Sequence, residues 1–166
     1  MAAKVKIREA RKEEMPAIRE MTVNELRDEL DEAERKDVDA MMKAAAQQME
    51  AILKQEGNEF YVAEIEGRPG MAGYLWFGVS RRPFSGVMVG WVYDVQVVES
   101  ERGKGVGEAL MRFAIETSRK RGFESAGLMV RANNKAAYSL YEKLGFVPDH
   151  VLMIREDRGT VSGSNS

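Results

Sequence analysis

Hydrophobic and polar residues recur along the chain with two different periods, which divide it into expected strands and helices. Residues 4–8 alternate as a short strand, and residues 13–30 are rich in helix formers. Apolar residues recur at helical spacing between residues 38 and 53, and Gly57 follows as a stop signal. The first part of the chain is therefore expected to form one strand and two helices.

The pattern then changes to strands. Residues 60–65 and 71–79 are rich in aromatic and β-branched residues, and residues 66–70 between them have strong turn chemistry. This predicts a hairpin. A second turn, residues 82–86, leads to a long third strand over residues 87–98.

Helical periodicity returns after a glycine-rich segment, with one apolar face that ends at basic residues before Gly122. We expect a short strand at residues 128–130, a helix over residues 134–144 closed by Gly145, and a last strand at residues 151–154. The predicted order is β-α-α-β-β-β-α-β-α-β, a layered α/β (α+β) domain.

The size of the chain suits one domain. It has 166 residues, of which 44% are hydrophobic, enough for a core. We expect a single domain over residues 1–157 and a flexible tail over residues 158–166, which is rich in glycine and serine.

Composition excludes several classes of partner and site. The 25 basic and 27 acidic residues give a net charge of -2, so nothing argues for nucleic acid as a partner. No run approaches the roughly 18 apolar residues of a membrane span, and the first residues lack a signal-peptide stretch, so we expect no membrane partner and a cytoplasmic protein. The chain has no cysteine, which excludes disulfides, thiolate metal sites and a cysteine nucleophile.

Glycines alternate with other residues where the third strand ends and a helix begins. The segment consists of Arg102, Gly103, Lys104, Gly105, Val106 and Gly107. Glycines allow close backbone approach, and a helix N-terminus attracts anions, so the segment predicts a phosphate or pyrophosphate site to which Arg102 and Lys104 add positive charge. It fits neither the P-loop nor the dinucleotide fingerprint, because Lys104 precedes glycine and a third glycine is missing at Glu108 or Leu110. A tight turn without a ligand remains the alternative.

The segment resembles the acyl-coenzyme A signature of the GNAT superfamily of N-acetyltransferases, Arg/Gln-x-x-Gly-x-Gly/Ala. Downstream residues resemble a second recurrent segment of that superfamily: Asn134, Ala137, Leu140, Tyr141, Gly145 and Phe146. The resemblance covers about residues 60–154, and the two N-terminal helices fit the superfamily's variable, substrate-facing region. The stretch after Phe146 is short where many members have a longer strand pair.

The resemblance implies a mixed, mostly antiparallel sheet flanked by helices, and acetyl-CoA as co-substrate, with no metal. It implies that the backbone amides of residues 102–107 hold the pyrophosphate. It also implies that the third strand splays from its neighbour at a bulge and that the pantetheine arm pairs with Val95, Gln96 and Val97. Asn134 matches a residue that contacts the coenzyme arm, although it equally suits a helix N-cap.

Two residues match catalytic positions of the superfamily. Tyr141 matches the tyrosine that protonates the leaving thiolate, a role that a phenol with a pKa near ~10 suits; packing in the core is the alternative. Asp94 matches an acidic position that could take the amine proton through water, and a structural carboxylate is the alternative. Tyr93 stands where some members carry a glutamate, and His150 is expected to be structural or solvent-facing. Without a cysteine, direct transfer in a ternary complex is the natural mechanism.

The expected function is acetyl transfer from acetyl-CoA to a primary amine of a small molecule or peptide. A protein N-terminal or lysine acetyltransferase is one alternative, and an acyl-CoA-binding sensor without catalysis is another; a homodimer stays open. Acidic residues between the first two helices could attract a cationic amine, although a solvated face is favoured. Aromatic residues could line an acceptor pocket or pack in the sheet: Tyr74, Trp76, Trp91 and Tyr93.

Overall fold

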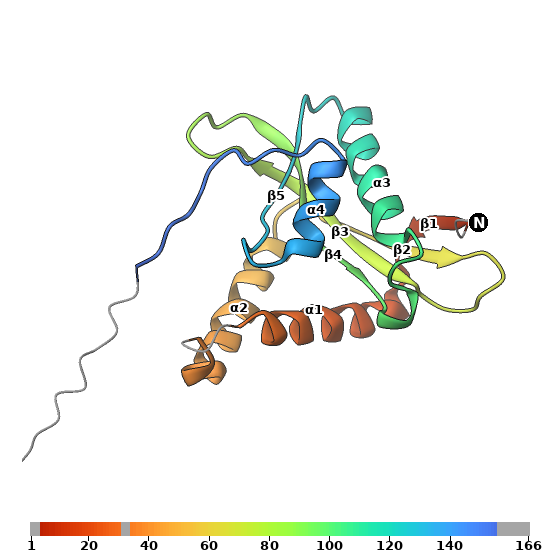
Figure 1. Ribbon diagram of the computed structural model, residues 1–166, viewed down its shortest axis with the longest axis horizontal. Coiled ribbons are helices and arrows are strands. Elements are labelled where there is room, and N and C mark those ends of the chain that lie inside the picture. The colour runs from red at the N-terminus through yellow and green to blue at the C-terminus, as the bar shows by residue number, and fades with distance from the viewer. Residues whose placement is uncertain (1–3, 31–33, 156–166) are drawn as a thin grey trace, which may run out of the picture.

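A central sheet carries helices on both of its faces in the computed structural model, which describes residues 4–30 and 34–155 (Figure 1). The strand order is β1-β2-β3-β4-β5, in which β1 to β4 pair antiparallel and β5 pairs parallel to β4. The strands are β1 (Val5–Glu9), β2 (Glu59–Ile65), β3 (Gly73–Arg81), β4 (Met88–Val97) and β5 (Ala126–Leu128). The predicted α/β class with a mostly antiparallel sheet is confirmed.

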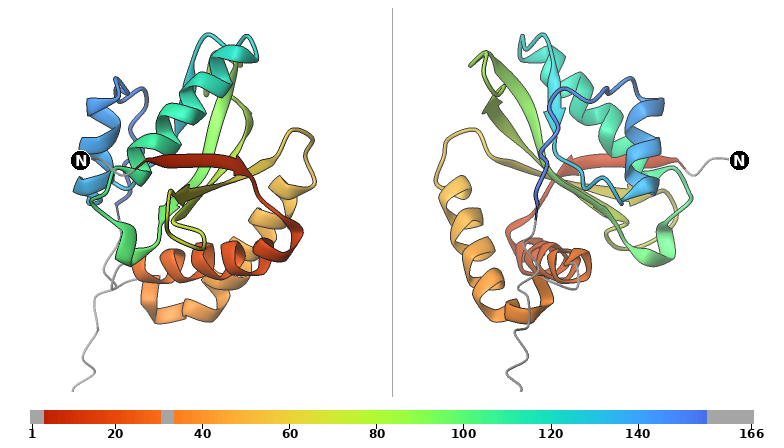
Figure 2. Two further views of the ribbon diagram at one scale, coloured as in Figure 1. Left: turned by 90° about the vertical axis from the view of Figure 1, so that its right-hand side faces the viewer. Right: turned by 60° about the vertical axis from the view of Figure 1, so that its left-hand side comes forward.

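Two helices lie on each side of this sheet (Figure 2). The first pair is α1 (Met15–Glu29) and α2 (Val38–Leu53), and the second is α3 (Val106–Lys120) and α4 (Lys135–Lys143). Three short 3-10 turns precede helices: η1 (Lys12–Glu14), η2 (Glu34–Asp37) and η3 (Glu99–Glu101). The predicted helices are thus confirmed, and the last of these turns connects the long strand β4 to the glycine segment.

The core has two parts, one on each face of the sheet. On the first face, Ile18 of α1 packs with Val62 and Tyr74 of the sheet, and all three are buried. On the second face, α3 packs on residues of β2, β3 and β4. Val106, Leu110 and Ala114 of the predicted apolar stripe are buried there, and Met111, which the pattern did not include, is buried beside them. Neither α2 nor α4 has a buried residue, so α1 and α3 supply the fully buried helix residues of the two core parts.

Two of the predicted strands differ from the structure. The strand expected at residues 128–130 lies at Ala126–Leu128, where it pairs with Gly90, Trp91 and Val92 of β4. The last predicted strand, at residues 151–154, is wrong: these residues form no strand and are exposed. A strand needs a neighbour for its backbone hydrogen bonds, and none of the described strands pairs with this segment. The predicted tail, residues 158–166, lies outside the described residues.

None of the helices in the described part of the chain combines the length and the apolarity needed to cross a membrane.

An ion-pair cluster ties the start of α1 to the sheet. The guanidinium of Arg8 on β1 lies 2.7 Å from Glu14 Oε1 and 2.6 Å from Glu64 Oε1 of β2. The Arg11 backbone N–H also donates to Glu14, at 2.7 Å. Hydrogen bonds from Arg8 lower the pKa of Glu14 to about 2. These side chains are largely shielded from solvent, so the cluster fixes the angle at which α1 leaves β1.

This cluster predicts an acid-dependent loss of stability. The folded-state pKa of Glu14 lies below its unfolded value, so its carboxylate stabilises the fold above about pH 4.5, and this stabilisation is lost as the pH falls toward 2. Glu14→Gln should lower the free energy of unfolding by about 2 kcal/mol at neutral pH and by much less near pH 3. Urea unfolding at both pH values measures the difference.

Glu66→Gln is the matched control, because Glu66 pairs with Lys4 at 3.2 Å in an exposed position. It should change stability little at either pH. A Glu14→Gln deficit that is equal at both pH values would contradict the assignment.

Candidate active site

A β-bulge interrupts the pairing of β4 with β3. Trp76 pairs with Asp94 and Phe77 with Val92, so Tyr93 between them has no partner. A bulge turns two consecutive side chains toward one face of a sheet. The Tyr93 ring lies 5.0 Å from the Trp76 ring on the α1 side, and Asp94 bonds Tyr74 on that same side. The bulge that the family resemblance implied is therefore present.

Beyond the bulge, β4 separates from β5. The parallel pairing of the two strands ends where Val92 meets Leu128, whereas β4 continues to Val97. Over Val95, Gln96 and Val97, β4 pairs with β3 on one edge only; on the other edge it has no strand partner among the described residues. On an edge without a strand partner, backbone N–H and C=O groups can bind an extended ligand; in this stretch the Val97 carbonyl accepts from Arg102 Nε at 3.4 Å and the Val95 N–H donates to Asp94.

The glycine segment lies at the end of this open edge. Gly103 and Gly105 have positive φ angles of 74° and 86°, and a Cβ at either would meet nothing within 4 Å. Gly105 is the N-cap of α3, and no side chain of the described residues caps it. Gly107 lies at the junction of three elements, because a Cβ there would be 3.5 Å from Val97 and 3.6 Å from Leu140. The uncapped first turn of α3 thus offers its N–H groups to an anion beside β4 and α4.

The positive charge predicted at the segment is partly neutralised. Lys104 Nζ lies 2.9 Å from Glu101 and donates to the Ser100 carbonyl at 2.7 Å. Arg68 also pairs with Glu101, at 3.1 Å, and the Lys104 hydrogen bond lowers the pKa of that carboxyl. Arg102 Nε donates to the Val97 carbonyl at 3.4 Å. Backbone amides, rather than free cationic side chains, therefore dominate the attraction for an anion.

Asp94 lies in a buried hydrogen-bond network between β4 and α1. Its carboxylate accepts hydrogen bonds from the Tyr74 hydroxyl and from Gln96 Nε2, the latter at 3.2 Å. The Tyr74 hydroxyl lies 2.7 Å from Thr22 Oγ1, which in turn donates to the Ile18 carbonyl. Burial raises the pKa of Asp94, and the hydrogen bonds from Tyr74, Thr22 and Gln96 oppose that shift only in part. A carboxyl with a raised pKa is a stronger base once it ionises.

Thr22 was not among the residues that the sequence singled out. A signal existed, because Thr22 follows Ile18 by one helical turn and so puts a hydroxyl on the buried face of α1. A buried hydroxyl requires a partner, which Tyr74 provides.

Asn134 and Tyr141 lie at the two ends of α4. The Asn134 side chain accepts a hydrogen bond from Ala137 N at 3.2 Å, so the N-cap interpretation is confirmed. Tyr141 is half-buried, packs against the core on the α3 side, and meets Phe146 edge-on at 6.0 Å. The structure thus shows Tyr141 in a packing role, and the coenzyme contact and the acid role remain predictions. Asp94 and Tyr141 lie on opposite faces of the sheet.

The aromatic candidates separate into different places. Trp76 stacks on Phe60 at 5.3 Å and on Tyr93 at 5.0 Å, which forms an aromatic row on the α1 side next to Asp94. Tyr74 is fully buried and belongs to the Asp94 network instead. Trp91 lies over Gly127 of β5, where any Cβ would come within 2.6 Å of its ring.

The remaining candidates do not join this site. His150 is exposed, lies 2.9 Å from Asp149 and stacks on Phe84, as expected for a solvent-facing residue. Of the acidic group between α1 and α2, Asp37 caps α2 and Asp28 is exposed. Asp31 and Glu32 lie outside the described residues.

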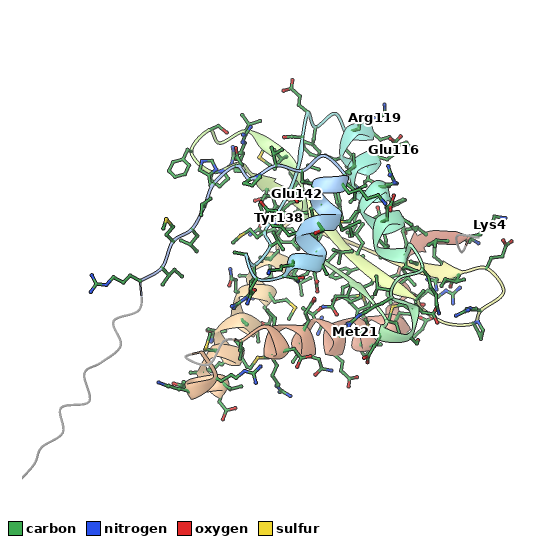
Figure 3. The ribbon with its side chains drawn as sticks, viewed as in Figure 1. Lys4, Met21, Glu116, Arg119, Tyr138 and Glu142 are labelled. Carbon is green, nitrogen blue, oxygen red and sulfur yellow. The ribbon has the colours of Figure 1, made fainter. Side chains whose placement is uncertain are left out.

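One hollow in the surface is separate from the bulge. A hollow of about 410 Å³ on the outer side of α4 is lined by Ala132, Lys135, Tyr138 and Ser139. Figure 3 shows Tyr138 and Glu142 projecting from that helix. The hollow reaches neither Asp94 nor Tyr141. Within residues 4–30 and 34–155, no three side chains of the kinds that bind metals gather in one place.

Comparison with known proteins agrees with this geometry. The model of the acetyltransferase (GNAT) family matches residues 17–146. A mycothiol acetyltransferase of Renibacterium salmoninarum is 34% identical over 86 residues, which are 52% of this chain and 25% of the relative. The uncharacterized N-acetyltransferase MJ1207 of Methanocaldococcus jannaschii is 31% identical over 107 residues, 61% of this chain and 44% of the relative. The chain thus matches less than half the length of these relatives.

Solved structures share the fold over nearly the whole chain. A Pyrococcus furiosus protein assigned as an acetyl transferase has a TM-score of 0.74 at 23% identity, with 93% of this chain and 100% of that chain covered. An aminoglycoside N-acetyltransferase in complex with CoA has a TM-score of 0.63 at 16% identity, with coverage of 95% and 97%. A transcriptional regulator from Bacillus halodurans has a TM-score of 0.62 at 25% identity, with coverage of 93% and 100%.

The buried carboxyl predicts an unusual pH dependence. The folded-state pKa of Asp94 is raised, so its stabilising contribution is complete below the unfolded pKa and is lost as the pH rises through the folded pKa. Asp94→Asn keeps a neutral side chain of the same shape. Relative to the natural chain, this variant should become progressively more stable as the pH rises above 3.8, the ordinary pKa of the carboxyl, which urea unfolding from about pH 3 to about pH 8 would measure.

Asp149→Asn is the control, because the pKa of Asp149 is shifted in the opposite direction: Arg82 lowers it to about 2. Its effect on stability should be constant between about pH 5 and about pH 8. A stability difference for Asp94→Asn that stays constant from about pH 3 to about pH 8 would contradict a raised pKa.

Proposed function

The chain belongs to the acetyltransferase (GNAT) family, and from that premise we propose that it transfers an acetyl group from acetyl-CoA to the primary amine of a small molecule or peptide, directly in a ternary complex. One observation carries the proposal: the open edge of β4 runs from a buried carboxyl at the bulge to the uncapped glycine turn of α3. An extended thioester ligand with a pyrophosphate at its far end suits that arrangement.

The glycine turn would bind the pyrophosphate. The two positive-φ glycines leave open space above the backbone, and the first-turn N–H groups of α3 would donate to phosphate oxygens. The pantetheine arm would pair with the free edge of Val95, Gln96 and Val97. Asn134 at the start of α4 would contact the same arm while it caps the helix.

Asp94 would act as the general base. An alkylammonium must lose a proton before its nitrogen can attack the thioester carbonyl, and Asp94 would accept that proton through a water molecule. Hydrogen bonds from Tyr74 and Gln96 hold the carboxylate in one orientation. Its raised pKa narrows the gap to the pKa of the amine, which favours the transfer.

Tyr141 would act as the general acid. As the new C–N bond forms and the C–S bond breaks, the leaving thiolate takes a proton from the phenol hydroxyl. Asp94 and Tyr141 lie on opposite faces of β4, so a thioester across the open edge would have the amine on one side and the acid on the other. The ammonium loses two protons in all: Asp94 takes the first before attack and later releases it to solvent, and the second leaves the nitrogen after the C–N bond forms and replaces the proton that Tyr141 gave to the sulfur.

The acceptor is proposed only as a class. The aromatic row of Phe60, Trp76 and Tyr93 beside Asp94 favours a flat or apolar group next to the amine. The mycothiol acetyltransferase name belongs to a relative that matches over a quarter of its length, so it supports acetyl transfer but no particular acceptor. Assays of free thiol release with arylalkylamines, polyamines, aminoglycosides and peptides, including N-terminal and lysine amines, would identify the class.

A second candidate is an acyl-CoA sensor without catalysis. The fold is shared with a Bacillus halodurans transcriptional regulator, which is the observation that favours it. Tight binding of acetyl-CoA with no thiol release across the whole acceptor panel would support the sensor and overturn the transferase.

The glycine turn gives a direct test of coenzyme binding. Gly105→Glu would place a carboxylate in the anion site and strain a backbone with a φ of 86°, so the affinity for acetyl-CoA should fall at least about 100-fold in a calorimetric titration. Gly86→Glu is matched in backbone strain, because Gly86 has a φ of 69° and open space around it in the β3–β4 loop. That control should leave affinity unchanged; equal effects of both variants, or no effect of the first, would reject the site.

The acid role gives a kinetic test. Tyr141→Phe keeps the ring that packs against Phe146 and removes only the hydroxyl, so turnover should fall by about 10²–10⁴-fold with little change in coenzyme affinity. Tyr138→Phe on the outer side of the same helix should keep full turnover. If Tyr141→Phe keeps full activity at every pH and only melts at a lower temperature, Tyr141 is a core residue.

A further inference from the structure

A row of oxygen atoms connects α1, which runs across one face of the sheet, to the carboxyl at the bulge (Figure 2). Thr22 Oγ1 lies 3.1 Å from the Ile18 carbonyl and 2.7 Å from the Tyr74 hydroxyl, and that hydroxyl contacts the Asp94 carboxylate. Tyr74 is fully buried and Thr22 is 9% exposed. Buried hydroxyls need partners within the protein, so the protons on this row determine which of its contacts are hydrogen bonds.

The number of protons on the row depends on the charge of Asp94. Each hydroxyl carries one proton and an ionised carboxylate carries none, so the three contacts share two protons and one contact has none. When Asp94 is protonated, three protons are available and all three contacts become hydrogen bonds. Asp94 then donates to Tyr74, Tyr74 donates to Thr22, and Thr22 donates to the Ile18 carbonyl.

The contact between Thr22 and Ile18 is the one that can be lost at least cost. It is longer than the contact to Tyr74, and the Ile18 carbonyl also accepts the backbone N–H of residue 22, because both residues lie in α1. Hydrogen bonds to a charged acceptor are about twice as strong as those between neutral groups. With Asp94 ionised, the Tyr74 proton therefore points to Asp94 and the Thr22 proton points to Tyr74.

We propose that the Thr22 hydroxyl is a two-position switch that stabilises the ionised form of Asp94: it donates to Tyr74 when Asp94 is ionised and to the Ile18 carbonyl when Asp94 is protonated. Thr22 acts through Tyr74, so it is a positioning residue. Its consequence for the reaction rests on the proposed function, in which Asp94 takes a proton from the amine. The carboxyl would gain and release that proton while each hydroxyl of the row keeps a partner in both states.

Titratable groups face the row from each of the three elements that form it. They are Tyr74 of β3, Tyr93 of β4 and Glu25 of α1. Burial raises the pKa of Tyr74, and the charges of Asp94 and Glu25 add to that shift, so the Tyr74 proton remains available to donate. Burial also raises the pKa of Tyr93. A substitution at Thr22 leaves all of these groups in place, so differences between Thr22 variants report on its hydroxyl.

The ionisation of Asp94 can be measured without any activity. Thr22→Val removes the hydroxyl and keeps the branched shape of the side chain. The pKa of the Asp94 carboxyl, followed by carbon NMR on the full chain and assigned with Asp94→Asn, should therefore rise further, because the ionised form loses a charge-assisted hydrogen bond. Thr22→Ser restores the hydroxyl and should return the pKa toward that of the natural chain.

Ser118→Ala is the matched control. Ser118 is a buried residue of α3, and its hydroxyl donates to the Ser125 carbonyl at 3.0 Å. The substitution thus removes a helix hydroxyl that bonds a backbone carbonyl, as Thr22 does, but on the other face of the sheet. It should leave the pKa of Asp94 unchanged. If Thr22→Val does not fold, Thr22→Ala against Thr22→Ser gives the same comparison, because that pair differs only in the hydroxyl.

The pH profile of the reaction connects the switch to the proposed function. With one amine acceptor, kcat/KM of Thr22→Val should fall by about threefold to tenfold on the acid side of the profile, which corresponds to the net contribution of one hydrogen bond. The plateau at higher pH should be kept, because Asp94 is ionised there in every variant. A general loss of structure would lower the whole profile instead.

The outcomes separate the switch from the proposed function. A raised pKa of Asp94 in Thr22→Val that serine reverses would establish the switch. An unchanged pKa in Thr22→Val, or an equal change in Ser118→Ala, would overturn it. If the pKa of Asp94 changes as expected but the pH profile does not follow, or no acceptor is acetylated, the switch stands and the assignment of Asp94 as general base fails.

Discussion

The single unpaired residue at Tyr93 sets the geometry on which the candidate site depends. A strand without a bulge would place Asp94 on the opposite face from Tyr93, against the apolar core under α3. The bulge instead delivers both side chains to the α1 side and increases the local twist of β4. The extra twist agrees with the loss of pairing to β5 just beyond, at Val92 and Leu128. The β-bulge at Tyr93 thus accounts for both the open edge of β4 and the position of the Asp94 carboxyl.

That arrangement buries a carboxyl, and burial has a large cost unless hydrogen bonds offset it. Two donors come from the sheet, Tyr74 of β3 and Gln96 of β4 itself, and Thr22 of α1 joins the network through the Tyr74 hydroxyl. The donors do not remove the effect of burial, because the pKa of Asp94 stays raised. The network therefore does two things at once. It connects α1 to the centre of the sheet, and it leaves the Asp94 carboxyl with a pKa above its ordinary value.

Periodicity along the chain was sufficient to predict all four helices and the first four strands, because those signals are local. The apolar stripe of α3 and the turn residues between β2 and β3 are read from neighbours in sequence. Strand pairing is not local. The sequence pattern therefore predicts the edge strand two residues too late, and it predicts a strand at residues 151–154 for which the described chain supplies no partner. The same limit applies to the site, where Thr22 and Glu101 matter only through contacts made by folding.

The glycine turn shows how such a contact changes an electrostatic argument. Counting charges in the sequence makes Lys104 a free cation, but the folded chain pairs it with Glu101, which Arg68 also contacts. An anion at the turn must then compete with a carboxylate for the ammonium, whereas the N–H groups of the first turn of α3 have no side-chain cap in the described structure. The backbone N–H dipoles have a fixed orientation, so an anion can bind them without displacing a carboxylate and without ordering a flexible side chain. The proposed phosphate site therefore depends mainly on the backbone conformation that Gly103 and Gly105 permit.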